Sequence, residues 1–348
     1  MDDLAQDHIE VTINIFEHAV VGLTPVLSFL AALLYLDSYK LVSMRAVVAV
    51  VACGLLAAIA CYELNGALLR VSGLDVETYT RFAGPVVEEL IKGLIVVALI
   101  RAHRIGFLVD AAIFGFAVGT GFAIVENVWY QHLIPDAGLG TWVVRGFGTA
   151  IMHGGTTAIF AMMGLAILEQ ERRAAFLAFL PGYALAVALH SAFNHMFGSP
   201  RLSTLAVLIV LPPLLFFVFQ RSERSVTDWL GRGFDADAQL LEAINSGRFA
   251  DSPTGRYLAS LKHRFKGPVV ADLVCYLRLH TELALRAKGI LMMRENGFDA
   301  PVDNDTRAKF TEMRYLEQSV GKTGLLAIHP LLHMSHKDLW QLYMLGNH

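Results

Sequence analysis

The sequence predicts an all-α membrane protein, with a polytopic bundle of about seven transmembrane helices over residues 1–220 and a helical cytoplasmic domain over residues 221–348. Composition is the first observation behind this prediction. Hydrophobic residues make up 55% and charged residues 17% of the chain, and the mean hydropathy is +0.51, far from an ordinary soluble domain. The second observation is that almost all of the apolar excess lies in the first 220 residues. The two regions are therefore expected to fold in different solvents, lipid and water.

The apolar residues of the first region fall in seven runs, each close to the ~20 residues that a spanning helix needs. The runs cover residues 19–36, 44–62, 84–100, 107–130, 143–168, 174–197 and 202–220. The acidic start of the chain has no basic region and no small-residue cleavage site, so the first run is expected to stay as an uncleaved targeting segment. Residues 63–84 are too polar to span and are expected to lie on the outer surface, partly as an amphipathic helix.

Basic residues predict the orientation of the bundle, because cytoplasmic loops are enriched in lysine and arginine. One alternating set of connections has an acidic N-terminus, Arg70 and Arg81 in a long acidic loop, no Lys or Arg from 131 to 141, and Arg201. The other set carries Lys40, Arg45, Arg101, Arg104, Arg172, Arg173, Arg221 and Arg224. This bias places the N-terminus outside and the C-terminus in the cytoplasm.

Four of the apolar runs carry ionisable or strongly polar side chains in their interiors, where such groups are costly and are usually kept for a function. They are Glu88, Glu89 and Lys92 in the third run, Glu126 and Asn127 in the fourth, His153 in the fifth, and His190 and Asn194 in the sixth. At ~1.5 Å rise per residue, threading the runs in order brings all of them into the outer half of the membrane. We therefore expect them to form one catalytic site inside the bilayer.

Helical spacing predicts different roles for the two adjacent acids. Glu88 and Lys92 are at i, i+4 and are expected to pair, whereas Glu89 points about 100° away around the helix. One carboxylate would then be held ionised by the lysine, and the other would be free to act as a base.

Two chemistries fit the converging residues. In the first, Glu126, His153 and His190 hold a divalent metal, zinc above all, as a His₂Glu set with one position left for water, and one of the paired glutamates is the base. In the second, a glutamate and a histidine activate water without a metal, and His190 and Asn194 stabilise the oxyanion. The sequence leaves both open.

The same residues form four motifs in fixed order on consecutive apolar runs. They are Glu88-Glu89-x-x-Lys92, Phe122-x-x-x-Glu126-Asn127, His153-x-x-x-Thr157 and His190-x-x-x-Asn194. This combination resembles the PrsW intramembrane proteases, distant relatives of the CAAX prenyl endopeptidase and bacteriocin-immunity (Abi) superfamily. Because Glu126 stands where the CAAX enzymes carry a histidine, their water-activating pair is not carried over.

The resemblance covers about residues 84–197 and implies an intramembrane endopeptidase of the bacterial inner membrane, so residues 1–220 are expected to form its protease domain. Its substrate would be a membrane-anchored protein, such as an anti-sigma factor, that is cut near the outer face of the membrane. The paired glutamates and the later histidine would be the essential groups. The bilayer and this substrate are the expected partners, no nucleic acid is expected, and the oligomeric state is left open.

Other classes of function compete with this one. Glu88 with Lys92 could be a structural ion pair, His153 could bond a helix carbonyl and Asn194 could join two helices, yet the joint set favours catalysis. A proton or cation transporter is disfavoured because the titratable groups stop about midway through the membrane. The remaining alternative is a non-enzymatic scaffold or immunity protein that works through its cytoplasmic domain.

The region after residue 220 begins with a basic stretch that favours the anionic inner leaflet and continues with amphipathic helical patterns, clearest from Val269 to Ile290. The spacing of His329, His333 and His336 suggests a metal site, but Pro330 disfavours a helical start there, so no metal is expected. The sequence from Ser335 to Asp338 is instead typical of a capping box that opens a final helix.

Overall fold

The computed structural model of the protein describes residues 2–170, 176–196, 199–298, 301–329, 331, 332, 337, 340, 341 and 344, with side chains from residue 16 onward except at 170. The described residues are helical and contain no strand, which confirms the all-α prediction. Contacts divide the chain into two units, Met1–Asp37 with Leu41–Ser222, and Ser38–Lys40 with Glu223–His348.

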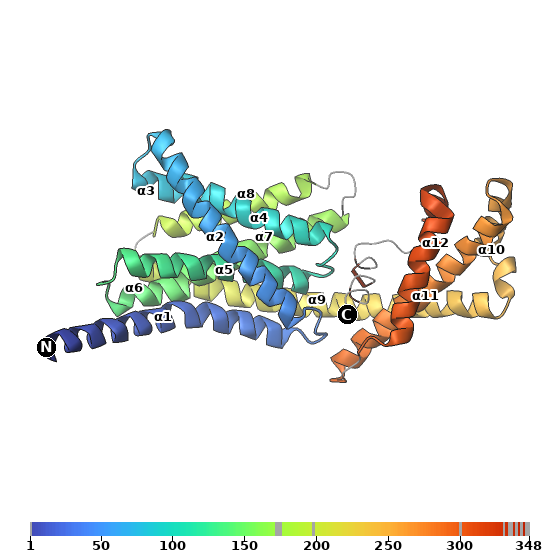
Figure 1. Ribbon diagram of the computed structural model, residues 1–348, viewed down its shortest axis with the longest axis horizontal. Helices are drawn as coiled ribbons and strands as arrows, with labels where there is room; N and C mark the ends of the chain where they lie inside the picture. Colours follow the sequence, from blue (N-terminus) through green and yellow to red (C-terminus); the bar gives the residue numbers. More distant parts are fainter. Residues whose placement is uncertain are drawn as a thin grey trace. The chain divides into compact units, whose positions relative to one another are not determined.

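Six helical stretches of the described chain are long and apolar enough to cross a membrane, and they fall on six of the seven predicted runs. They are α1 (Asp2–Leu36), α2 (Met44–Ser72), α5 (Leu108–Leu133), α6–η2–α7 (Leu139–Val143, Val144–Ala150, Ile151–Gln170), η3–α8 (Leu177–Phe179, Leu180–Asn194) and α9 (Pro200–Asn245), as Figure 1 shows. The third run forms α4 (Gly84–Arg101), whose four charged side chains set it apart from the six. The prediction of a polytopic helix bundle is confirmed.

The polar stretch after the second run differs from the prediction. Helix α2 continues to Ser72, and Gly73, at a φ of 70°, ends it. A short helix, α3 (Val76–Thr78), follows with Asp75 as its N-cap, and hydrogen bonds from Thr78 hold the pKa of Asp75 below its usual value. The π-helical turn η1 (Tyr79–Ala83) then leads into α4. Much of the expected surface helix is therefore an extension of the second span.

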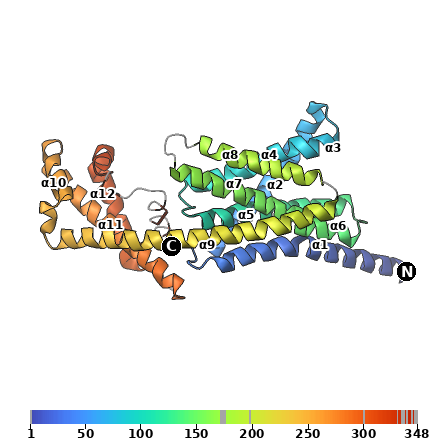
Figure 2. The ribbon, with the colours of Figure 1, turned by 180° about the vertical axis from the view of Figure 1, so that it is seen from behind.

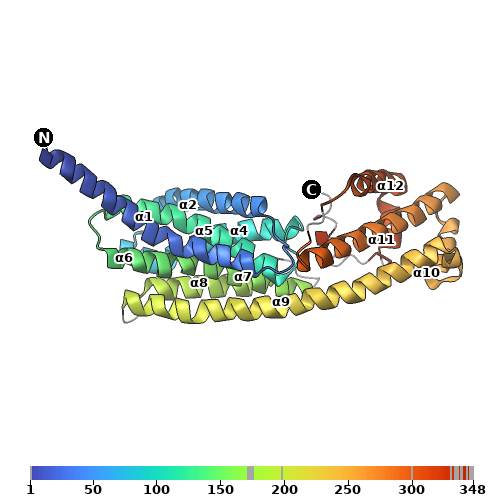
Figure 3. The same cartoon turned by 90° about the horizontal axis from the view of Figure 1, so that it is seen from below.

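Helix α5 is the centre of the first unit and packs on α2 and on α7. Glycines make both contacts close: a Cβ on Gly121 would lie 2.1 Å from the Val51 carbonyl oxygen of α2, and one on Gly119 would lie 2.2 Å from the His153 carbonyl oxygen of α7. Small residues serve this purpose in membrane helix pairs, where backbone approach replaces the hydrophobic effect. The first part of α9 runs alongside α7 and α8 (Figures 2 and 3).

The second unit is built from the end of α9 and a set of shorter elements. These are η4 (Arg248–Asp251), α10 (Pro253–Ser260), η5 (Leu261–His263), α11 (Gly267–Glu295) and α12 (Asn304–Ile328). The amphipathic pattern predicted from Val269 to Ile290 is confirmed, since α11 buries Val270, Leu273, Leu277, Leu283, Ala287 and Ile290. His329 follows α12, whereas His333, Ser335, His336 and Asp338 lie outside the described residues, as do Arg172 and Arg173.

Candidate active site

Two π-helical turns stand directly before helices that carry the polar residues, η1 before α4 and η2 before α7. Such turns are rare and often occur at functional sites, because the extra residue re-aims the side chains that follow. Helix α8 holds η1 in place: Ser191 Oγ donates to the Arg81 carbonyl at 2.5 Å, and Asn194 Nδ2 donates to the Thr80 carbonyl at 2.9 Å. Gly146 lets η2 approach α1, where a Cβ would lie 2.3 Å from a backbone oxygen.

Glu89 is the centre of a buried polar cluster. Its Oε1 atom accepts from Lys92 Nζ at 2.6 Å, from His190 Nδ1 at 2.8 Å and from Thr156 Oγ1 at 3.3 Å. The side chains of Glu89 and Lys92 are 1% and 0% exposed. Three donors on one oxygen, one of them an ammonium, fix this carboxylate in position.

The predicted pairing of Glu88 with Lys92 is wrong, because Lys92 bonds Glu89 at i, i+3 instead. Both spacings place two side chains on one face of a helix, so the tertiary partners decide between them. His190 and Thr156 converge on Glu89 from α8 and α7, which makes that carboxylate the better site for the lysine. The acid expected to be free is therefore the one that is held.

Glu88 is the less constrained of the two acids. Its side chain is 19% exposed, and its Oε2 atom lies 3.8 Å from His190 Nε2. Its Oε1 atom accepts from Asn65 Nδ2 at 3.2 Å, and Asn65 Oδ1 in turn accepts from the Tyr79 hydroxyl at 3.0 Å. Glu88 is thus oriented by the neutral amide of Asn65 from α2, which Tyr79 of η1 holds in turn, and it keeps room for a further partner.

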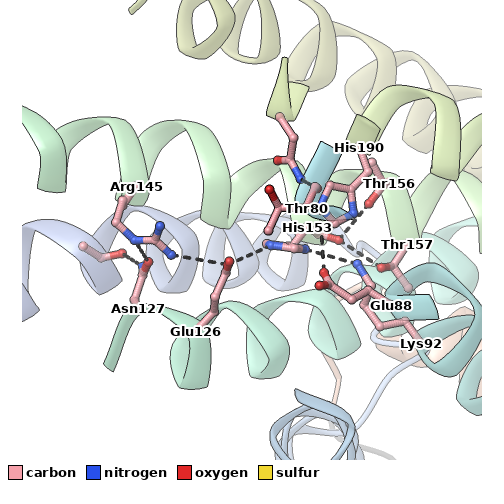
Figure 4. Close-up of polar contacts among 12 residues, drawn as sticks. Thr80, Glu88, Lys92, Glu126, Asn127, Arg145, His153, Thr156, Thr157 and His190 are labelled. Atoms are coloured by element: carbon pink, nitrogen blue, oxygen red, sulfur yellow. Dashed lines mark hydrogen bonds and ion pairs between the residues drawn. The ribbon is translucent and has the colours of Figure 1, made fainter. Parts of the chain in front are cut away.

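His153 lies between a cation and an acid, as Figure 4 shows. Its Nδ1 atom is 3.2 Å from Lys92 Nζ, and its Nε2 atom is 2.9 Å from Glu126 Oε2. Because an ammonium only donates, Nδ1 accepts, and Nε2 carries the proton that it donates to Glu126. The His153 ring meets His190 edge-on, with ring centroids 4.8 Å apart.

A second polar chain supports Glu126 from the side of α1 (Figure 4). Arg145 Nη2 lies 3.4 Å from Glu126 Oε2, and Arg145 Nε donates to Asn127 Oδ1 at 2.9 Å. Asn127 Nδ2 donates to the Gly22 carbonyl at 2.8 Å. The carboxylate that orients His153 is therefore itself oriented by groups from η2, α5 and α1.

The structure brings Glu88, Glu89, Glu126, His153 and His190 together, but it places Asn194 differently. One turn after His190, the Asn194 amide donates to a backbone carbonyl of η1. This bond fixes α8 against the turn before α4. A role for Asn194 in binding an oxyanion stays a prediction.

Glu88, His153 and His190 offer ligand atoms that all lie within 4.8 Å of one another. Tetrahedral zinc with bonds near 2.0–2.1 Å holds its ligand atoms about 3.3 Å apart, close to the 3.8 Å between Glu88 Oε2 and His190 Nε2. Glu126, the acid predicted from sequence, does not belong to this group, because it is engaged by His153 and Arg145. The residues fit a His₂Glu set, provided that the His153 nitrogen that binds gives up its present partner.

Sequence reasoning missed the two residues that orient Glu88. Asn65 lies three residues past the end predicted for the second span, and Tyr79 lies in the stretch assigned to the outer surface. An asparagine on the continuation of an apolar helix is a signal for an interhelical hydrogen bond, but only once the helix is known to continue.

Comparison with known families places this geometry in context. A family model described as PrsW family intramembrane metalloprotease matches residues 42–219, just over half of the chain. Comparisons with curated proteins and with solved structures give no match. The matched region contains all five clustered acids and imidazoles and the helices that deliver them. With half of its length and its whole buried polar cluster inside the match, this protein is a member of the PrsW family of intramembrane metalloproteases.

Proposed function

We propose that Glu88 is the general base of a peptide-bond hydrolysis that acts on a membrane-anchored protein near the outer face of the membrane. One observation carries this assignment. Glu89 and Glu126 are each bonded to an imidazole and a cation, whereas Glu88 faces the Nε2 atom of His190 across a 3.8 Å gap. A base needs a free lone pair directed at water, and Glu88 has one.

In the proposed reaction, a water between Glu88 and the imidazoles gives its proton to the Glu88 carboxylate as its oxygen attacks the carbonyl carbon. The C–N bond then breaks, and Glu88 returns the proton to the leaving nitrogen. Glu89 holds the Nδ1–H of His190, so the lone pair of Nε2 stays directed at the reacting centre. The Lys92 ammonium, 3.2 Å from His153, adds positive charge that favours the oxyanion.

The same residues also fit a second chemistry, in which Glu88, His153 and His190 hold a zinc ion, Glu126 and Glu89 orient the two imidazoles, and Glu88 serves as a ligand instead of the base. Glu88 replaces Glu126 as the third ligand because of the geometry of the group. A bound divalent metal would supply Lewis acidity that polarises the substrate carbonyl and acidifies a water. Carboxylate–histidine pairs behind a metal are a common arrangement, and this cluster contains two of them.

Metal removal separates these two chemistries, and because the family is described as metalloproteases we expect it to stop cleavage. Purified protein treated with 1,10-phenanthroline should lose activity and regain it when zinc is added back, and elemental analysis should find stoichiometric zinc. His190→Ala should lose both metal and activity, whereas His132→Ala, on the exposed end of α5, should keep both. Full activity in a chelated preparation without detectable metal would contradict the zinc site and favour the direct Glu–His mechanism.

The proposed orientation has the N-terminus outside and residues 221–348 as a helical cytoplasmic domain. It is tested with single cysteines in a background in which Cys53, Cys61 and Cys275 are serine. Arg104→Cys should react with a membrane-impermeant maleimide only after the cells are permeabilised, and Asp136→Cys should react in intact spheroplasts. Labelling of position 104 in intact spheroplasts would reverse the topology.

The proposed substrate class is a bacterial inner-membrane protein with a single anchor, for example an anti-sigma factor. The test compares membrane-protein fragments in cells that carry the wild type or Glu89→Gln, with His132→Ala as the matched control. We expect fragments cut close to the outer end of an anchor in the wild type and the control, and none in Glu89→Gln. Identical fragments in all three strains would overturn the proposed proteolysis.

A further inference from the structure

An apolar cavity of about 470 Å³ lies between α7, α8 and the first part of α9. We call it the α7–α9 cavity. It is lined by Met152, Gly155, Thr156, Ile159, Leu189, Ala192, Phe193, Leu202, Ser203, Ala206, Val207, Val210, Leu211 and Leu214. None of these described lining residues is charged, and the cavity volume is in the range of ligand-binding pockets. Its chemistry therefore fits an apolar occupant.

The α7–α9 cavity shares its wall with the catalytic cluster. Thr156 lines the cavity, and its hydroxyl donates to Glu89 Oε1 at 3.3 Å. Two further lining residues, Met152 and Leu189, directly precede His153 and His190 in the sequence. An occupant of the cavity would thus lie one helix wall away from the reacting groups.

The α9 wall of the cavity packs closely on α7 at some positions and opens toward the surroundings of the bundle at others. A Cβ on Gly155 of α7 would lie 2.5 Å from Leu211, which marks one point of close contact. Ala206 and Val210, which also line the cavity, are exposed. Pro212 and Pro213 stand inside α9 at this level and remove backbone hydrogen bonds, which bends or loosens a helix. An apolar chain lying in the membrane therefore has a lateral route into the cavity.

We propose that the α7–α9 cavity is the binding site for the apolar membrane anchor of the substrate, taking large apolar side chains next to the bond that is cut. This inference rests on the proposed function, because only a protease needs a peptide segment held beside its base. Thr156 connects the cavity to the catalytic cluster, because its side chain lines the cavity and its hydroxyl bonds to Glu89, the acid that positions His190. A lipid acyl chain has the right polarity but brings no peptide bond to the cluster, so it is the outcome that the test must separate.

The first arm of the test measures binding without catalysis. A synthetic single-span Leu/Ala peptide that carries photo-leucine is mixed with the purified Glu88→Gln protein in phosphatidylcholine/phosphatidylglycerol vesicles and irradiated. Crosslinks are expected on the α8 and α9 walls of the cavity. Ala206→Phe and Ala192→Phe, which fill it from those two walls, should each lower the yield about tenfold, as expected when a hydrophobic pocket loses room for a side chain. Ala49→Phe, at an exposed alanine on α2, should leave the yield unchanged.

Two results of this arm would overturn the proposal: crosslinks spread evenly over the lipid-facing helices, or equal yields in all three phenylalanine variants. A third is labelling of the cavity by a photoactivatable phospholipid that excess peptide does not reduce, because the site would then belong to lipid.

The second arm uses a substrate found by the fragment comparison. Ala206→Phe in the otherwise wild-type protein should cleave substrates with a large apolar residue beside the cut site poorly, and a small residue at that position should restore cleavage. Loss of cleavage that no substrate change restores would contradict a binding role. Crosslinking without cleavage in any strain would reject the protease, whereas cleavage without cavity crosslinks would reject only the cavity.

Discussion

Glu88→Gln and Glu89→Gln are each expected to abolish cleavage while the protein stays inserted in the membrane. Glu88→Gln removes the proposed base, and loss of general acid–base catalysis lowers rates by about 10²- to 10⁴-fold. Glu89→Gln removes the charge that orients His190 and pairs with Lys92, which disorganises the site without removing the base. Cleavage by purified protein, measured on a substrate from the fragment comparison, checks both.

Stability separates the two acids. Glu88 is partly exposed and bonded to neutral Asn65, so Glu88→Gln should leave the thermal unfolding midpoint nearly unchanged. Glu89→Gln leaves the Lys92 ammonium buried without its counter-ion, so its midpoint should fall. Glu63→Gln, at an exposed position of α2, is the matched control for both measurements. Activity near the wild-type level in either Glu88→Gln or Glu89→Gln would remove that acid from the mechanism.

Lys92→Met is expected to be the most destabilising single change in the cluster. Removing one partner of a buried ion pair costs about 3–5 kcal/mol, because the other charge is left without compensation. The Glu89 carboxylate would keep only His190 and Thr156 as donors. Thermal unfolding in detergent should show this loss, and cleavage should be lost as well.

The double variant Glu89→Gln/Lys92→Met isolates the pair from the rest of the fold. With both charges gone, its midpoint should recover most of the loss seen in Lys92→Met, although it should remain inactive. Lys262→Met, at an exposed position of the second unit, controls for the loss of a lysine as such. If Lys92→Met and the double variant unfold at the same temperature, the charges of Lys92 and Glu89 do not stabilise each other.

The sequence was sufficient to locate the spans and the helices that supply the polar cluster, because both depend on the lengths of apolar runs and on rare charges within them. It could not choose the partner of Lys92. Spacings of three and four residues are equivalent on an isolated helix, and only the approach of His190 and Thr156 distinguishes Glu89 from Glu88.

The sequence was also unable to identify the third ligand of the proposed metal site. The depths predicted from the sequence made Glu126 and Glu88 equivalent, since both were expected in the outer half of the membrane. Arg145 and His153 engage Glu126, which leaves Glu88 as the third ligand. The position of Arg145 depends on how η2 packs against α5 and α1. The role of Asn65 could not be predicted for a different reason. Hydropathy ended the second span at residue 62, whereas hydrogen bonding continues α2 to Ser72.

The π-helical turns make the geometry of this site depend on chain length as well as on residue identity. An α-helix advances about 100° per residue, so one residue fewer in η1 or η2 rotates everything downstream by roughly that angle. Such a deletion would turn Glu88 or His153 away from its partners while leaving every titratable group in the sequence. The lengths of the two segments, Tyr79–Ala83 and Val144–Ala150, thus determine which way the side chains of the following helices point. Relatives that keep this chemistry should tolerate substitutions there more readily than insertions or deletions.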